Sequence, residues 1–423
     1  MFWLIEDLNQ LKGFYNKGFK QVYIEVIPTS HSKHPVENEV SLIYVRPINY
    51  KKGYIISINH TEALSINLKH IEKIISQFDK VFVYDKKLFM HYFYNKNIID
   101  LMLTKHKLNV KLTSCHEFII NGNQQEENIN IIIPINKHYE FLENKFNQLK
   151  QYINAEYNSF FNNKASLVFN HIEENGIRID IPKFEEHFKP TTKDILYTEY
   201  NYNTLTTRPS NRFGGINFAA ISKKDNRREA FIPKNDYFLE MDISAYHPTL
   251  ISNLIKYKFP EGDIHEYFAE LYGVSYDKAK ELTFKQINGG VFDNYKHLEF
   301  FQKTTEYIEG LWEEFNENGF VEVPVSKYKL YKDELEDMNP QKLMNYYIQA
   351  LETAVNVIIL WDIIKLLKDY KTHIVLYVYD SILLDMSNEE EHLIEKIKNE
   401  FEKRNLKIKM KKGNNYGELR RYE

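Results

Sequence analysis

The order of apolar and polar positions divides this 423-residue chain into segments that favour strands and segments that favour helices. Near the beginning, short apolar runs rich in β-branched and aromatic residues predict strands. They cover residues 22–27, 40–45, 54–58 and 81–84. Residues 63–78 instead carry apolar side chains at helical spacing. The first 135 residues therefore predict an α/β module that opens with a meander of strands.

The middle of the chain changes character twice. Residues 137–176 favour one or two helices, with Gly176 placed to end the last of them. Residues 183–215 are rich in threonine and carry Pro190, Pro209 and the pair Gly214-Gly215. Such a composition indicates a largely irregular connector.

From residue 231 onward the pattern again predicts mixed α and β structure. A strand at 237–244 precedes a helix at 246–257, and residues 263–318 favour helices. The following segments predict a strand pair near 320–331, a long helix at 340–369, strands at 373–379 and 382–386, a helix at 389–404 and a basic strand at 407–412.

Composition excludes several classes of protein. The chain is 43% hydrophobic and 27% charged with a formal net charge of −4, so any nucleic-acid contact must use local basic patches. Its single cysteine, Cys115, excludes an intramolecular disulfide framework. No apolar run approaches the roughly 20 residues of a membrane span, and the first residues lack a basic leader, so we expect no membrane partner and a cytoplasmic location.

Two aspartates stand in apolar runs of strand type. Asp242 lies in the run at 237–244, and Asp380 lies in the run at 373–385. A carboxylate is costly to bury without a partner or a cation. If the two strands are neighbours, the pair suggests a site for two divalent metals of the kind used in nucleotidyl transfer. A structural ion pair is the alternative explanation.

A series of ordered segments resembles the motifs of family A DNA polymerases, the DNA polymerase I class. The segments are 207–211, 226–231, 242–248 (motif A), 262–265 (the start of the fingers), 285–290 (the O-helix), 345–350, 378–381 (motif C) and 413–418. The first 180 residues resemble, more weakly, the 3′–5′ exonuclease domain that precedes this polymerase core.

The resemblance implies an α+β multidomain fold. Residues 1–160 would form an RNase H-like exonuclease-type α/β domain, and 161–206 a bridging helix with a vestigial thumb. Residues 207–423 would form the palm and fingers of a right-hand polymerase, with the fingers at about 260–318. Because only residues 181–206 replace a thumb, we expect weak, salt-sensitive DNA binding unless a processivity or replisome partner compensates.

The resemblance also assigns the catalytic roles. Asp242 and Asp380 would hold two Mg²⁺ ions, with Mn²⁺ as a substitute, and the backbone carbonyl of Ile243 could add a ligand. Lys285 would neutralise the triphosphate and act as a general acid towards pyrophosphate.

Further residues would bind the nucleotide and the DNA. The expected nucleotide-binding residues are Lys285, His247, Tyr246, Lys280 and Gly289. The expected DNA-binding residues are Arg208, Arg227, Arg228, Asn345, Gln349 and Tyr379.

Several of these positions depart from the family pattern. His247 stands where the family has a glutamate that blocks a ribose 2′-hydroxyl. Glu281 replaces the O-helix arginine, and Gly289 replaces the aromatic residue that stacks on the incoming base. In the exonuclease-like part, Glu25, Asp85 and Glu143 fall at the acidic motifs, but too few acids remain for catalysis. An inactive nuclease fold is therefore favoured.

Three functions remain open from the sequence. The leading one is a template-directed DNA polymerase that extends a primer with dNTPs, in replication or repair of a phage or other mobile element inside its host cell. His247 and the Asp380-Ser381 pair favour an RNA-synthesising, primase-like enzyme of the same superfamily as the second. The missing O-helix arginine and aromatic residue favour a non-catalytic DNA-binding replisome subunit as the third.

Overall fold

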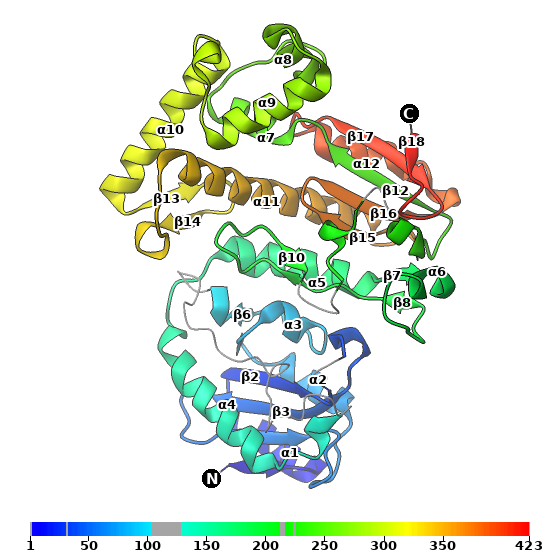
Figure 1. The fold of residues 1–423 in the computed structure, drawn as a ribbon. Coiled ribbons are helices and arrows are strands. Elements are labelled where there is room, and N and C mark those ends of the chain that lie inside the picture. The colour runs from blue at the N-terminus through cyan, green and yellow to red at the C-terminus, as the bar shows by residue number, and fades with distance from the viewer. Residues whose placement is uncertain (1, 31–32, 104–127, 212–215, 223–225, 423) are drawn as a thin grey trace. The chain divides into compact units, whose positions relative to one another are not determined.

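The computed structural model describes residues 2–30, 33–103, 128–211, 216–222 and 226–422. Cys115 and the pair Gly214-Gly215 lie outside these ranges. The chain forms two compact units, Met1–Glu174 and Asn175–Glu423 (Figure 1). Each unit is described by itself.

The first unit is built around a six-stranded mixed sheet of order β1-β4-β3-β2-β5-β6 (Figure 1). The strands are β1 (Trp3–Ile5), β2 (Gln21–Pro28), β3 (Val40–Pro47), β4 (Tyr54–Ser57), β5 (Lys80–Val83) and β6 (Ile98–Asp100). Consecutive strands β2, β3 and β4 pair antiparallel, whereas β2, β5 and β6 pair parallel. The predicted opening meander is confirmed.

Side chains of β2 alternate between two hydrophobic cores, one on each face of the sheet. Val22 and Ile24 pack in a cluster with Phe14, whereas Tyr23 packs in a second cluster with Phe146. The helices of this unit are α1 (Leu8–Tyr15), α2 (Leu68–Ile75), α3 (Lys86–Met90) and α4 (Ile135–Leu149). The predicted helix at 63–78 is shorter than expected, because Asn67 caps its first turn by accepting from the backbone N–H of Lys69.

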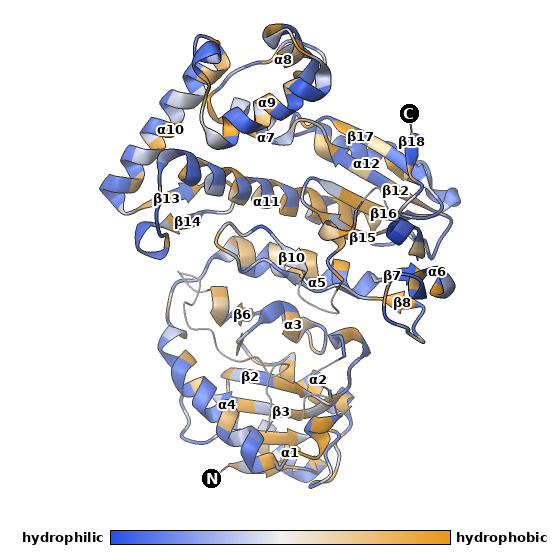
Figure 2. Cartoon of the chain, in the orientation of Figure 1, coloured by the Kyte–Doolittle hydropathy of each residue, from blue (hydrophilic) through white to orange (hydrophobic). Residues whose placement is uncertain are grey.

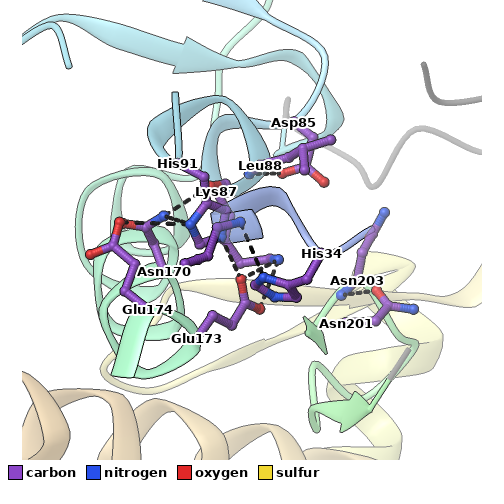
Figure 3. Close-up of polar contacts among 11 residues, drawn as sticks. His34, Asp85, Lys87, Leu88, His91, Asn170, Glu173, Glu174, Asn201 and Asn203 are labelled. Atoms are coloured by element: carbon purple, nitrogen blue, oxygen red, sulfur yellow. Dashed lines mark hydrogen bonds and ion pairs between the residues drawn. The ribbon is translucent and has the colours of Figure 1, made fainter. Parts of the chain in front are cut away.

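Helix α5 (Ser166–Asn175) is held to α3 by a buried polar cluster (Figure 3). The Lys87 ammonium lies 2.8 and 2.9 Å from the two carboxylate oxygens of Glu173. His91 Nε2 lies 2.9 Å from Glu173 Oε2. Burial opposes protonation of His91, but hydrogen bonds to Glu173 and Glu174 outweigh it and raise the pKa of the imidazole.

Gly176 ends α5 in the left-handed region, with φ +60°. A Cβ added there would lie 2.7 Å from the Ile195 side chain and 2.9 Å from the Tyr197 ring. The predicted helix end is thus confirmed, since only glycine fits both the dihedral and the space. The segment that follows contains short elements: β7 (Ile177–Ile179), α6 (Ile181–Glu185), β8 (Ile195–Leu196), β9 (Tyr200–Asn201) and β10 (Ser210–Asn211).

A five-stranded antiparallel sheet of order β15-β16-β12-β17-β18 forms the centre of the second unit. Its strands are β12 (Tyr237–Ile243), β15 (His373–Val378), β16 (Ser381–Met386), β17 (Ile408–Gly413) and β18 (Arg420–Tyr422). The short strand β11 (Phe231–Ile232) pairs instead with β7. Hydrophobic residues line β15 and β16 (Figure 2), and Phe238, Val375 and Leu383 share one buried cluster.

Helices accompany this sheet in the order that the sequence predicts. They are α7 (Tyr246–Leu254), the 28-residue α11 (Pro340–Leu367) and α12 (Leu393–Glu402). The predicted long helix and the two strands around Asp380 are confirmed.

A second group of helices, α8 (Ile264–Tyr272), α9 (Tyr276–Gly289) and α10 (Glu299–Asn318), precedes α11 (Figure 1). Phe259, Phe268, Phe300 and Phe301 form an aromatic cluster within it, with ring centroids between 5.1 and 5.7 Å apart. The predicted strand pair follows as the hairpin of β13 (Phe320–Val323) and β14 (Tyr328–Tyr331).

Candidate active site

Asp242 lies near the end of β12, and Asp380 lies in the turn that leads into the neighbouring strand β16. Strand β12 pairs antiparallel with β16, and Asp242 stands opposite Ser381. The backbone N–H of Ile243 donates to the carbonyl oxygen of Asp380 at 2.9 Å. Both aspartates line one cavity of about 610 Å³. The strand pairing therefore brings together two carboxylates that are 138 positions apart in sequence.

The two carboxylates are more accessible than their apolar flanks suggest. Asp242 is half-buried and Asp380 is exposed, because each stands at the end of its strand, where the cavity opens. Two carboxylates with a backbone carbonyl nearby suit Mg²⁺, which prefers oxygen ligands and keeps several of its waters. Within the described ranges, no group of three or more His, Cys, Asp or Glu residues is arranged to hold a metal ion, so the protein ligands would be few.

The turn between β15 and β16 is fixed by polar contacts. Tyr379 adopts φ +56°, which is costly for a residue other than glycine. Asn356 of α11 donates to the Tyr379 carbonyl at 2.8 Å, and the Arg208 guanidinium lies 3.9 Å from the centroid of the Tyr379 ring. These contacts hold the turn that presents Asp380.

Glu352 of α11 is a buried acid at the edge of the cavity that the sequence analysis missed. Its side chain is 1% exposed, and Oε2 lies 2.6 Å from His247 Nε2. Arg208 Nη2 approaches Oε1 at 3.3 Å. Burial, followed by the charge of Glu352, raises the pKa of Tyr246 well above its usual value. Glu352 stands between the apolar residues Leu351 and Ala354, but the second acid of this helix, Asp362, also has apolar neighbours, so the sequence pattern did not distinguish it.

Helix α9 turns one face to the cavity. Its lining residues are Tyr276, Asp277, Lys280, Glu281, Thr283, Phe284, Ile287 and Asn288. Lys280, Phe284 and Asn288 recur every four positions, as expected for one helical face. Phe284 is 63% exposed although it is a large apolar residue, and the sequence analysis did not select it. The spacing from Lys280 could have identified it.

Lys285 and Gly289 do not line the cavity in the part of the chain that the structure describes. The Lys285 ammonium lies 2.5 Å from Glu281 Oε1, and its side chain is 55% exposed. Hydrogen bonds from Lys285 and Lys278 lower the pKa of Glu281 to about 2. Glu281 therefore carries a full negative charge and pairs with both lysines.

Basic groups gather at one end of the cavity. Lys409 of β17 stands opposite Asp242, and its ammonium lies 3.1 Å from the Tyr276 hydroxyl and 3.4 Å from Asp263 Oδ2. Burial lowers the pKa of His265. The ammonium groups of Lys280 and Lys409 also lower it, whereas the carboxylate of Asp263 raises it. This end of the cavity is suited to an anion.

The remaining predicted DNA-binding residues lie outside the cavity lining. Arg228 is buried and donates from Nε and Nη2 to the Ile221 carbonyl at 3.1 and 3.0 Å. Asn345 donates to the Asn288 carbonyl at 2.9 Å, which joins α11 to the end of α9. Gln349 of α11 and Arg227 are half-buried.

The acidic positions of the first unit have different surroundings. Glu25 and Asp85 line a cavity of only about 30 Å³ together with Lys145. Lys145 Nζ lies 2.6 Å from Glu25 Oε1, and both side chains are buried. Glu143 lies apart, where its carboxylate accepts from the Tyr44 hydroxyl at 2.7 Å and from Arg46 Nε at 3.2 Å.

Comparisons with known proteins agree with this architecture. No protein-family model and no curated protein matches the chain. Among solved structures, the POL domain of Pol1 from M. smegmatis, in complex with DNA primer-template and dNTP, superimposes with a TM-score of 0.70 at 12% identity. The match covers 98% of this chain and 100% of that domain. The chain therefore shares the fold of this POL domain.

The search for membrane-spanning segments gave no candidate. Among the described residues, no helix is both long enough and apolar enough to cross a bilayer.

Proposed function

We propose that this chain is a template-directed DNA polymerase that adds deoxynucleotides to the 3′ end of a primer. The observation that carries the proposal is the convergence of Asp242 and Asp380 in one open cavity. The similar Pol1 domain binds primer-template DNA and a dNTP, and its fold is the one found here. A fold alone does not define an activity, so the carboxylate pair and its basic neighbours are essential to the argument.

The reaction is an in-line displacement at phosphorus. The primer 3′ oxygen loses its proton and bonds to the α-phosphorus, and the bond from that phosphorus to the bridging oxygen breaks. Pyrophosphate leaves with the electron pair. Asp242 and Asp380 would hold two divalent cations, which stabilise the charge on the attacking and leaving oxygens when bound.

The other lining residues suit the nucleotide. Lys280 lines the cavity and would bind the triphosphate through its charge, whereas His265, whose pKa is lowered, would contribute a hydrogen bond. The exposed ring of Phe284 would stack on the incoming base, the role that the family pattern gives to the position of Gly289. Lys285, assigned from the sequence, would reach the phosphates only after leaving Glu281.

Arg208, Tyr379, Asn345 and Gln349 are proposed to contact the primer-template. Arg208 is the best supported of these residues, because it lines the cavity and stacks on Tyr379 at the turn that bears Asp380. The buried Arg228 instead is proposed to support the polypeptide around Ile221. A contact with the phosphate backbone would position DNA without reading its sequence.

Sugar selection is assigned to His247. Glu352 fixes its ring at the edge of the cavity through a 2.6 Å contact, so the imidazole would restrict space near the ribose. The histidine at this position also favours the second candidate, an RNA-synthesising enzyme. An imidazole can donate a hydrogen bond to a ribose 2′-hydroxyl.

The first unit is proposed to lack nuclease activity. Lys145 lines the small cavity together with Glu25 and Asp85, where a nuclease would hold metal ions, and it pairs with Glu25. Its ammonium already balances one carboxylate charge. We further propose that residues 181–206 form a reduced thumb and that the chain therefore binds DNA weakly. Its proposed role is replication or repair of a mobile element in the cytoplasm of the host.

Extension of a labelled primer on a template, with dNTPs or NTPs and Mg²⁺, tests the function. We expect the full chain to incorporate dNTPs and the Asp242→Asn variant to be inactive, while Asp369→Asn, at an exposed position in the same unit, serves as the control. Incorporation of NTPs in preference to dNTPs would establish the RNA-synthesising alternative. Binding of primer-template without incorporation of either would establish the non-catalytic one.

A further inference from the structure

A second cavity adjoins the candidate active site. It has a volume of about 570 Å³ and is lined by α7, the segment leading to α8, and the start of β17. Ser244, Ala245 and Lys409 line both cavities. The two cavities therefore adjoin at the residues that follow Asp242 and at one lysine.

The lining of the second cavity is basic. Lys258, Lys407 and Lys409 contribute to it, and among the described lining residues Asp263 is the acid. The Asp263 carboxylate is engaged, since Oδ1 accepts from the His265 backbone N–H at 2.7 Å. The charges of the lining sum to an excess of positive charge. A dianion or trianion is the ligand class that such a wall attracts.

Lys409 stands at the junction of the two cavities. It faces Asp242 across the β12–β17 pair, and its ammonium reaches Tyr276 at the start of α9. His265 lines the first cavity near the same junction. Its Nδ1 atom is buried and has no hydrogen-bond partner in the described part of the chain, although its side chain is 8% exposed. A buried nitrogen without a partner indicates that a polar ligand belongs there.

We propose that the second cavity receives the pyrophosphate released by nucleotide addition. This inference rests on the proposed polymerase function. In an in-line displacement the leaving oxygen lies opposite the attacking one, so pyrophosphate must depart on the side away from the primer. Lys409 and then Lys407 would donate charge-assisted hydrogen bonds to the pyrophosphate oxygens.

Calorimetric titration of the full chain with inorganic pyrophosphate and Mg²⁺ tests the site directly. We expect Lys409→Gln to weaken binding by at least about tenfold, because hydrogen bonds to charged groups are the stronger ones. Lys407→Gln should weaken it less, and Lys409→Arg should restore most of it. The control is Lys412→Gln on the same strand, whose ammonium pairs with Glu391 at 2.6 Å. Equal affinity of the wild type and the Lys407→Gln/Lys409→Gln double variant would overturn the inference, as would absence of binding to the wild type.

Kinetics separate this inference from the proposed function. In primer extension, the inhibition constant for pyrophosphate should rise in Lys407→Gln by a larger factor than the KM for dNTP. If the wild type extends primers but the two constants change in parallel, the exit site is wrong and the polymerase stands. If the wild type extends no primer, the polymerase function fails, and the calorimetric result alone decides whether the cavity binds polyphosphate.

Discussion

Acidic side chains on or directly after strands of the two units have contrasting surroundings. In the second unit, Asp242 and Asp380 line a cavity of about 610 Å³. In the first unit, Glu25 and Asp85 line one of about 30 Å³, and the Lys145 ammonium lies 2.6 Å from Glu25. One acid pair thus lines a large cavity, whereas the other lines a small one in which a lysine of the chain pairs with one of the acids.

The contrast shows that acids at the positions of a motif do not define a metal site. A buried carboxylate needs a counter-charge, and either a lysine or a metal ion can supply it. At Glu25 the Lys145 ammonium, 2.6 Å away, supplies such a counter-charge. In the proposed function, the cations at Asp242 and Asp380 would come from solution, and Lys280 and Lys409, which line the same cavity, would favour an anionic substrate.

The largest effect is expected from Asp380→Asn. Loss of one carboxylate weakens the site for cations that stabilise the transition state by several kcal/mol, so we expect the incorporation rate to fall at least about a thousandfold. Rapid-quench measurement of a single dNTP addition gives the rate. Because Asp380 is exposed, the melting temperature should stay unchanged. A rate within about tenfold of the wild type would contradict this role.

Lys145→Met should break the closed site and destabilise the first unit. Removing one partner of a buried ion pair leaves the other charge uncompensated, which costs about 3–5 kcal/mol. Urea unfolding measures this loss, and the Glu25→Gln/Lys145→Met double variant should recover part of it. A change below about 1 kcal/mol would mean that the pair is effectively solvated.

Lys280 and Lys285 can be distinguished by their effects on nucleotide binding. Lys280→Gln should raise the KM for dNTP by about 10- to 100-fold, since it removes a charged contact with the triphosphate. Lys285→Gln should have a smaller effect, because its ammonium pairs with Glu281. A larger rise in KM for Lys285→Gln than for Lys280→Gln would instead support the triphosphate role of Lys285 that the motif resemblance implies.

The smallest effect concerns the pH dependence of the first unit. Burial opposes protonation of His91, but Glu173 and Glu174 outweigh it, so its pKa in the folded state is raised above the ordinary 6.5. The His34 ring, at 5.6 Å, and Lys87 also face it. The stabilisation is fully present below pH 6.5 and is lost as pH rises through the raised pKa.

Urea unfolding between pH 6 and 9 tests this, with His91→Gln as the comparison. The wild type should lose stability over this range relative to the variant. Parallel curves would show that His91 is neutral throughout.

The sequence was sufficient to predict the strands that carry Asp242 and Asp380, because each lies in an apolar run of strand length and alternation. The face of α9 was not predictable in the same way. Lys280 and Lys285 are five positions apart, which places them on different faces at 100° per residue. Packing against the rest of the unit selects the face that carries Lys280.

Long-range partners were also beyond the sequence. Glu352 lies 105 positions from His247, and Lys145 lies 120 positions from Glu25. Their pairing follows from tertiary contacts that no local pattern encodes. Glu143 was grouped with Glu25 and Asp85 from its motif, but its carboxylate binds Tyr44 and Arg46.

The contrast between the two sites is tested most directly by measuring Mn²⁺ binding. Electron paramagnetic resonance monitors the ion in the presence of primer-template and a non-hydrolysable dNTP analogue. Mn²⁺ accepts the same oxygen ligands as Mg²⁺. We expect the wild type and the Glu25→Gln/Asp85→Asn variant to bind the ion equally, and the Asp242→Asn/Asp380→Asn variant to lose that binding. Retained binding in the Asp242→Asn/Asp380→Asn variant, or loss of binding in the Glu25→Gln/Asp85→Asn variant, would contradict the account.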